Sequence, residues 1–231
     1  MNIYVLGHNY EKGAGGLTYL WSKSKSKAGR FIIPQPDNEW VPYRDIRFEH
    51  GGLLSYGATA KGGRLTSKTK SELLKLWFLS EPSEKYSRDV VGSFGKLLHD
   101  MPLCSEKLKS AITTLDENTF EFLEIENVWD ESHNCPIDGG PFFMANLLIR
   151  ADAWDKEKSQ IVSLKRADGT SYNSVSISRC VVDGSQVPES GIWRDSLTNT
   201  VLCTKEYRDV LITAGCRGWS FTEVPVTNGK Q

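Results

Sequence analysis

The chain has 231 residues, which is enough for one large domain or two small ones. Hydrophobic residues make up 39% and charged residues 25%, close to the values of globular proteins, which excludes a disordered or fibrous chain. Lys and Arg together number 28 and Asp and Glu 29, so no overall charge attracts the protein to nucleic acid or to an anionic membrane.

The N-terminal residues MNIYVLGHNY lack the basic start and the apolar run of a signal peptide. No apolar stretch in the chain approaches the roughly 18 residues that a membrane span needs. We therefore expect a soluble protein of the cytoplasm, with neither nucleic acid nor a membrane as its partner.

Short strands joined by long loops are predicted for the first part of the chain, where apolar strings such as residues 3–6 and 31–33 alternate with segments rich in Gly, Ser, Lys and Pro. Thr69 and Glu72 have the spacing of a capping box, which predicts that a helix starts there. Residues 1–95 thus form an N-terminal region that ends in a helical hairpin. The apolar residues at helical spacing are Leu73, Leu74, Trp77 and Phe78 in its first helix and Val90, Val91, Phe94, Leu97 and Leu98 in its second.

An internal similarity appears when residues 103–125 are laid without gaps on residues 202–224, at an offset of 99. Each copy begins with Leu-Cys and a hydroxyl residue, Ser105 or Thr204, of the kind that caps a helix. An amphipathic stripe and a strand-like string follow in both copies. Each copy is predicted to be a strand, a helix and a strand, with Cys104 and Cys203 as buried thiols. Duplication and chance similarity both explain the pattern.

Four short segments rich in β-branched or aromatic residues lie between the copies and are predicted to be strands. These segments are residues 144–150, 161–164, 175–182 and 192–193. Asp168-Gly169 lies between the second and the third and favours a hairpin turn. We expect an α+β fold with a mixed or mainly antiparallel sheet and helices on one face, formed by a domain over residues 96–226 and followed by a flexible tail, 227–231.

No pattern of catalytic residues stands out. His133 and Cys135 are the only nucleophile and base close in sequence, and no known cysteine-enzyme signature surrounds them. Gly57–Arg64 resembles a phosphate loop but has Gly63 where the loop needs Lys. The four histidines are scattered and the five cysteines contain no CxxC pair, which predicts neither a metal nor a cofactor.

Three segments, taken in order and spacing, carry a family resemblance: residues 102–109, which begin Pro-Leu-Cys-Ser; residues 146–159; and residues 192–224, which end Gly-Trp-Ser-Phe-Thr-Glu-Val. Over about residues 101–224 the chain resembles a family of immunity proteins from bacterial polymorphic toxin systems, formerly a domain of unknown function. It departs from the family pattern at Trp193, where Phe is more usual, and at Thr204, where Ser is more usual.

The resemblance implies a non-enzymatic antitoxin of interbacterial competition. Its partner would be a cognate toxin domain encoded by an adjacent gene, bound without catalytic residues or cofactor. Two alternatives remain open. One is an enzyme of unrecognised class, with His133 and Cys135 as its first candidates, and the other is a regulatory protein whose partner is not a toxin.

Residues that belong to the family pattern are expected to hold the fold rather than to choose the partner; these are Asn146, Asp152, Asp155 and Ser159. Partner contacts are expected in segments that the pattern leaves unspecified, where aromatic anchors stand beside charges. The candidates are Trp40 and Tyr43 in one such segment and Trp129, Asp130 and Glu131 in another. The alternative for the two tryptophans is that they pack against the core.

Overall fold

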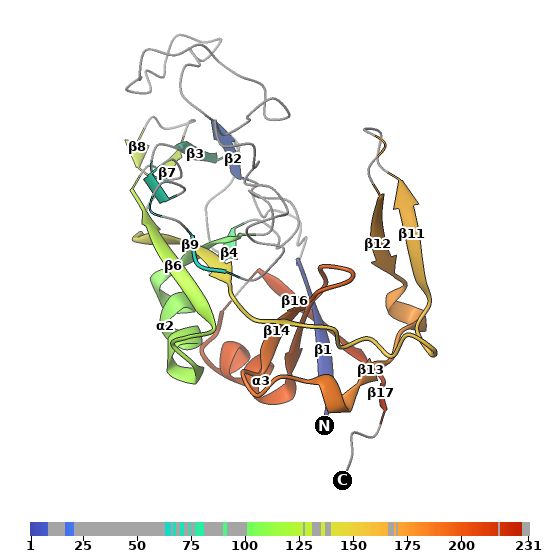
Figure 1. Ribbon diagram of the computed structural model, residues 1–231. Coiled ribbons are helices and arrows are strands. Elements are labelled where there is room, and N and C mark those ends of the chain that lie inside the picture. Colours follow the sequence, from blue (N-terminus) through green and yellow to red (C-terminus); the bar gives the residue numbers. More distant parts are fainter. Residues whose placement is uncertain are drawn as a thin grey trace.

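The computed structural model is an α+β protein in which strands predominate (Figure 1). Two α-helices of the described residues, α2 and α3, lie in the lower half of Figure 1, beside the two larger sheets. No helix in the part of the chain described below is long and apolar enough to cross a membrane. The structure describes residues 1–8, 17–20, 63–65, 67, 70–71, 74, 77–80, 90–91, 101–126, 128–130, 135–136, 140–165, 169, 171–216 and 218–227.

The largest sheet has five strands, and the N-terminal strand lies inside it. β1 pairs antiparallel with β15 on one side and with β16 on the other. The strand order is β10 (Arg150–Ala151), β14 (Ile192–Asp195), β15 (Val201–Thr204), β1 (Ile3–His8) and β16 (Trp219–Val224). Because side chains alternate across a strand, Tyr4 and Leu6 enter one core while Ile3 and Val5 enter another on the opposite face. The sheet is therefore buried on both faces.

A second sheet has four strands, and each of these two sheets has one strand that leads directly into an α-helix. Its order is β4 (Val90–Val91), β5 (Leu103–Ser105), β9 (Phe142–Leu147) and β6 (Phe120–Ile125). Helix α2 (Glu106–Leu115) follows β5 directly, as α3 (Lys205–Thr213) follows β15. The Ser105 hydroxyl accepts the Leu108 N–H at 3.2 Å, and the Thr204 hydroxyl accepts the Tyr207 N–H at 3.4 Å. Both predicted helix caps are confirmed.

The two sheets repeat one unit, and the match extends to the strand register. The first unit is β4, β5, α2, β6 and β9; the second is β14, β15, α3, β16 and β1. Leu103 pairs with Met144 in the first unit, and Leu202, 99 residues after Leu103, pairs with Val5 in the second. The same rule converts every paired position of the first unit into one of the second. Adding 99 to a residue number in β5 or β6 gives its equivalent in β15 or β16, and subtracting 139 from a residue number in β9 gives its equivalent in β1. Each β5–β9 and β6–β9 pair becomes a β15–β1 or β16–β1 pair in this way. Such a match is what duplication of one unit produces.

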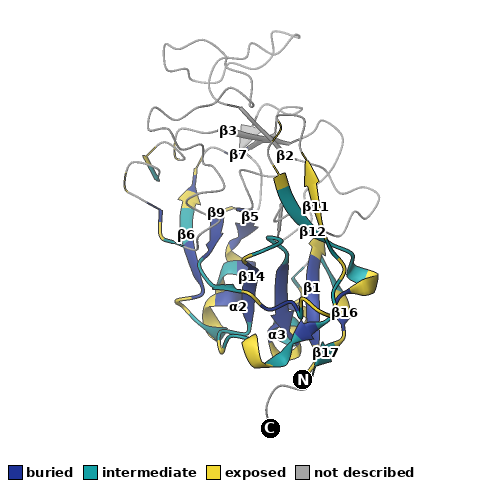
Figure 2. Ribbon diagram, turned by 45° about the vertical axis from the view of Figure 1, so that its right-hand side comes forward, coloured by how far each residue is buried: buried dark blue, intermediate teal, exposed yellow. Residues whose placement is uncertain are grey.

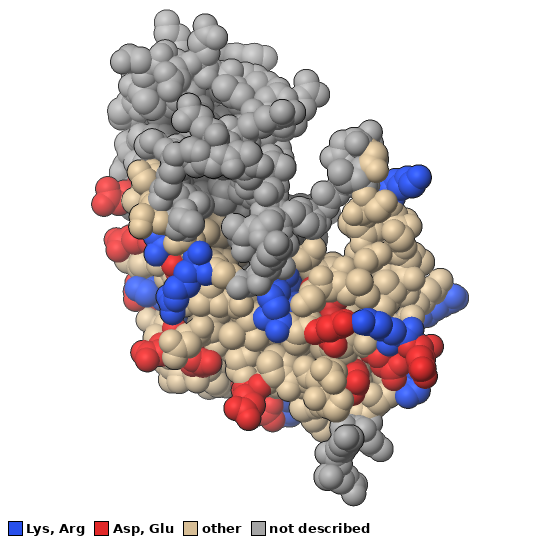
Figure 3. Space-filling model, in the orientation of Figure 1, with Lys and Arg blue, Asp and Glu red and all other residues tan. Residues whose placement is uncertain are grey.

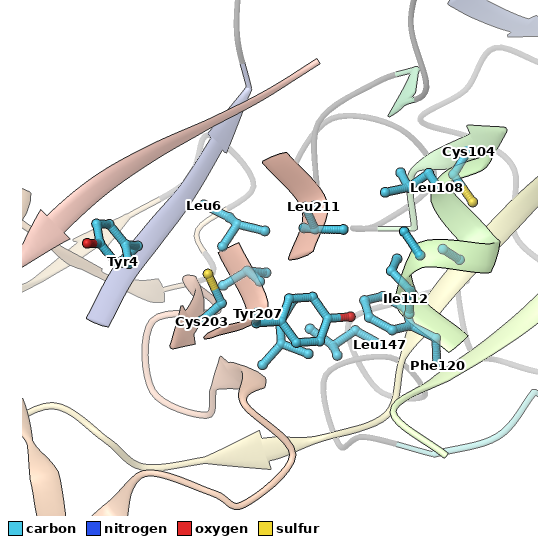
Figure 4. Close-up of a cluster of buried hydrophobic side chains, with 14 of the residues drawn as sticks. Tyr4, Leu6, Cys104, Leu108, Ile112, Phe120, Leu147, Cys203, Tyr207 and Leu211 are labelled. Carbon is cyan, nitrogen blue, oxygen red and sulfur yellow. The ribbon is translucent and has the colours of Figure 1, made fainter. Parts of the chain in front are cut away.

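The two helices face each other in a shared core (Figure 4). Leu108 and Ile112 of α2 meet Tyr207 and Leu211 of α3, and all four are at most 2% exposed. Strands of both units complete this core. Its strand residues are Tyr4, Leu6, Cys104, Phe120, Phe143, Ala145, Leu147, Ile192, Val201 and Cys203.

A second core lies on the other face of the five-stranded sheet, where the segment between β9 and β14 covers it. Trp154 and Val182 of this segment pack with Trp193 and Leu202 of the sheet, and each is at most 2% exposed. The segment includes the 3-10 turns η3 (Ile177–Arg179) and η4 (Gly184–Gln186) and strand β13 (Val182–Asp183), which pairs parallel with β17 (Val226–Thr227).

Two further sheets complete the described structure. One has the order β2 (Leu17–Leu20), β3 (Trp77–Ser80), β7 (Val128–Asp130) and β8 (Cys135–Pro136). The other is a hairpin of β11 (Ile161–Lys165) and β12 (Ser171–Val175).

The predicted helical hairpin is wrong where the chain is described. Helical backbone occurs at Ser67 and at residues 70–71, but Trp77–Ser80 and Val90–Val91 are strands. Short apolar runs suit either periodicity, and pairing with strands distant in sequence decides the outcome. The predicted strand at 175–182 is also wrong, because β12 ends at Val175 and η3 follows.

Candidate functional site

The β11–β12 hairpin projects from the body of the protein, and its strands pair only with each other among the described strands (Figure 1). Val162 and Leu164 are each 41% exposed, although both are large and apolar. Residues two apart share one face of a strand, so both side chains lie on the same face of the hairpin. Figure 2 shows β11 mostly exposed, whereas the larger sheets are mostly buried.

The base of the hairpin is tied to the core beneath it. Ile161 and Val175 are register partners, and both pack against the core that contains Trp154 and Trp193. The N–H of Gln160 bonds to the Arg179 carbonyl at 2.8 Å. A two-stranded hairpin is marginally stable alone, so these contacts hold the apolar face in place.

Two residues of the family pattern shape the turn that leads into β11. The Asp155 carboxylate accepts the backbone N–H groups of Glu157 and Lys158, each at 3.1 Å, and pairs with the Lys158 ammonium at 3.1 Å. The Lys158 side chain is the largest cause that lowers the pKa of Asp155 below its ordinary value. The Ser159 hydroxyl donates to the Val181 carbonyl and accepts the Val181 N–H, both at 3.0 Å. These contacts support a structural role for both residues.

The other two pattern residues also bond within the chain. Asp152 forms an ion pair with Lys156 one turn along the chain. The buried Asn146 amide donates to the Gly63 carbonyl at 2.9 Å and to a Glu121 carboxylate oxygen at 3.1 Å.

Glu121 is the centre of a buried polar cluster, at 6% exposure. It accepts the Leu65 N–H at 2.7 Å and the Asn146 amide, and it pairs with the Lys70 ammonium at 2.8 Å. Burial alone would raise the pKa of Glu121, but these hydrogen bonds and the Lys70 charge together lower it below its ordinary value. The cluster connects Gly63, Leu65 and Lys70 to the sheet of β4, β5, β9 and β6.

A second buried carboxylate, Asp195, is fully enclosed. It accepts N–H groups from Ala153, Leu197 and Thr198 at 2.8–3.1 Å and the Thr198 hydroxyl at 2.9 Å. Burial raises the pKa of Asp195, against the opposing effect of these hydrogen bonds. The carboxylate connects the segment after β10 to the turn after β14, which is a structural task.

The structure brings Trp129 and Asp130 onto one short strand, β7, between β3 and β8. Asp130 is the register partner of Cys135 on β8. Trp40, Tyr43, Glu131 and His133 lie outside the described residues, as do the side chains of Trp129, Asp130 and Cys135.

Val162 and Leu164 were not among the predicted contact residues. The alternation of Ile161–Lys165 does predict a strand, but alternation is typical of a strand with one buried face. Only the fold shows that this apolar face lies in solvent.

The described part of the chain offers no group of three or more His, Cys, Asp or Glu residues placed to hold a metal ion. On the face in Figure 3, acidic and basic side chains are interspersed over the lower part of the molecule, while the hairpin surface is largely uncharged. The exposed feature that stands out is therefore apolar and fits protein contact better than charged-ligand binding.

A family model described as "Immunity protein family (Imm11)" matches residues 69–226, which is more than half of the chain and includes both helices and the β11–β12 hairpin. No curated protein matches the chain.

Proposed function

This chain belongs to the Imm11 immunity protein family, and we propose that it protects its producer by binding a cognate toxin domain, encoded by an adjacent gene, and blocking it through direct contact. Such inhibition needs no catalytic group of its own. The proposed place of action is the cytoplasm of the producing cell.

The observation that carries the proposal, beside the family, is the exposed apolar face of the β11–β12 hairpin. Protein interfaces depend on a few apolar or aromatic anchors surrounded by polar groups. Val162 and Leu164 supply such anchors, at 41% exposure each, with Ser163 and Lys165 beside them. The tied base keeps this face ordered before the partner arrives, which lowers the entropy cost of binding.

The hairpin and β7 both lie in connecting segments rather than among the elements of the repeated units. β7 lies in the connection between β6 and β9, and the hairpin lies in the connection between the two units. The units themselves bury their apolar residues against each other. Variation in the connections would change partner choice without changing this shared scaffold, which supports both segments as contact regions.

We retain Trp40, Tyr43, Trp129, Asp130 and Glu131 as proposed contact residues outside the hairpin. Replacing Trp40, Tyr43, Trp129 and Asp130 singly by Ala tests this. A contact residue weakens toxin binding with little change in unfolding free energy, whereas a core aromatic costs about 3–5 kcal/mol of stability. If all four variants bind as tightly as the parent and stay folded, these segments are not the interface.

The function itself is tested by co-expression with the toxin domain of the adjacent gene. The protein should restore growth, and the purified pair should co-elute in size-exclusion chromatography. Rescue without any complex, lost on substitution of His133 or Cys135, would identify an enzyme instead.

A further inference from the structure

We propose that the toxin is held by strand addition: an extended, uncharged segment of the toxin pairs with the free edge of β11 and packs apolar side chains on Val162 and Leu164. This inference rests on the proposed function and specifies how the partner is recognised.

β11 is the outer strand of the hairpin. Figures 1 and 2 both place β12 toward the body of the protein and β11 on the side away from it. Residues 162–165 of β11 are all exposed, whereas residues 172–175 of β12 are half-buried. Among the described strands only β12 pairs with β11, so the outer edge of β11 is available to a partner.

The register identifies which backbone groups point outward. The Ser176 N–H bonds to the Gln160 carbonyl at 3.3 Å, which makes these two residues a hydrogen-bonded pair at the base of the hairpin. Hydrogen-bonded and non-hydrogen-bonded residue pairs alternate along an antiparallel ladder. The backbone N–H and C=O groups of Val162 and Leu164 therefore bond to β12. Ser163 and Lys165 then direct their N–H and C=O groups away from β12, as a strand-addition site requires.

The side chains of the hairpin select the chemistry of the added strand. Among the ten residues of β11 and β12, Lys165 alone is charged. Natural proteins protect free edges with proline, several charges or a bulge, and β11 has one terminal lysine and no proline. An uncharged strand with apolar side chains on one face therefore matches Val162 and Leu164.

The test uses proline to remove one outward N–H. Ser163→Pro leaves the β11–β12 hydrogen bonds in place, because the Ser163 N–H does not point to β12, and its ring occupies the edge. Ser163→Ala is the matched control, since it keeps the N–H. The probe is the inactivated toxin domain encoded by the adjacent gene, and binding is measured by calorimetry with the full chain.

Strand addition predicts that Ser163→Pro binds about tenfold or more weakly than Ser163→Ala, with equal urea midpoints for the two variants. Should Ser163→Pro fail to fold, Lys165→Pro against Lys165→Ala repeats the comparison at the next outward position.

Three outcomes overturn the inference. Equal binding of the proline and alanine variants, with the parent also bound, rejects strand addition while the proposed function stands. A dimer of the free protein in sedimentation that Ser163→Pro makes monomeric assigns the edge to a second copy of the chain. A parent that neither binds the domain nor restores growth rejects the proposed function together with this inference.

Discussion

The Lys109 ammonium lies over the ring of Phe143, 3.8 Å from its centroid. The Arg208 guanidinium, 99 residues later, lies over the ring of Tyr4 at 4.7 Å. Phe143 and Tyr4 occupy the same register position, opposite Cys104 in one unit and opposite Cys203 in the other. The two units thus share a cation–π contact as well as their caps and strand order.

Lys109→Met and Arg208→Met should each lower the free energy of unfolding by about 0.5–1 kcal/mol, because each removes a partly exposed cation from an aromatic face but keeps most of the apolar side chain. Urea unfolding measures the change. Glu106→Gln is the control for Lys109, since it removes the ion pair between Glu106 and Lys109 but keeps an acceptor for the Ser110 hydroxyl. If only one of the two substitutions lowers the free energy of unfolding, the two cation–π contacts are alike in geometry but not in energy.

Glu121→Gln should destabilise the protein by about 1–3 kcal/mol at pH 7, because it removes the charge from a cluster of buried hydrogen bonds. Hydrogen bonding lowers the folded-state pKa of Glu121 below its ordinary value of 4.5, despite burial. This stabilisation is therefore present above about pH 4.5 and is lost as the pH falls through the folded-state pKa.

Urea unfolding of parent and variant from pH 7 to pH 3 checks this, and the difference between them should shrink at the acid end. Glu124→Gln, an exposed position on the same strand, should change little. A difference that is independent of pH would mean that the carboxylate charge is not the stabilising element.

Cys104 and Cys203 should not react with a thiol reagent while the protein is folded. Both are fully buried, and burial raises the pKa of each thiol far above its ordinary value, so the reactive thiolate is scarce. Peptide mass spectrometry after brief labelling at pH 8 locates the modified residues. Cys216, which is half-buried, should be labelled first among these three. Rapid labelling of Cys104 or Cys203 without urea would contradict their place in the core.

Val162→Ser and Leu164→Ser should weaken toxin binding by about 1–2 kcal/mol each, since both remove an apolar anchor. Their effect on unfolding should stay below about 1 kcal/mol, because both side chains are 41% exposed. Calorimetry and urea unfolding of the same preparations separate the two effects. Unchanged binding would place the interface elsewhere on the protein.

Local signals were enough to predict the repeated strand–helix–strand segments. Ser105 and Thr204 indicate where the two helices begin, and the spacing of the apolar residues that follow predicts α2 and α3. The strand at Trp77–Ser80 was missed because pairing with β2 and β7, both distant in sequence, outweighs its helical spacing. The same limit applies to the candidate site, since the exposure of Val162 and Leu164 depends on which faces the rest of the fold covers.

The position of β1 between β15 and β16 also sets when the five-stranded sheet can form during synthesis. Ile3 pairs with Thr204 and Val224, so β1 leaves the ribosome roughly 200 residues before the strands that flank it. At about 5–20 residues per second that delay is on the order of 10–40 s. Pairing over such a separation is slow to form. A chain that stops before β15 cannot close the five-stranded sheet, so this sheet stays incomplete until β15 and β16 have been synthesised.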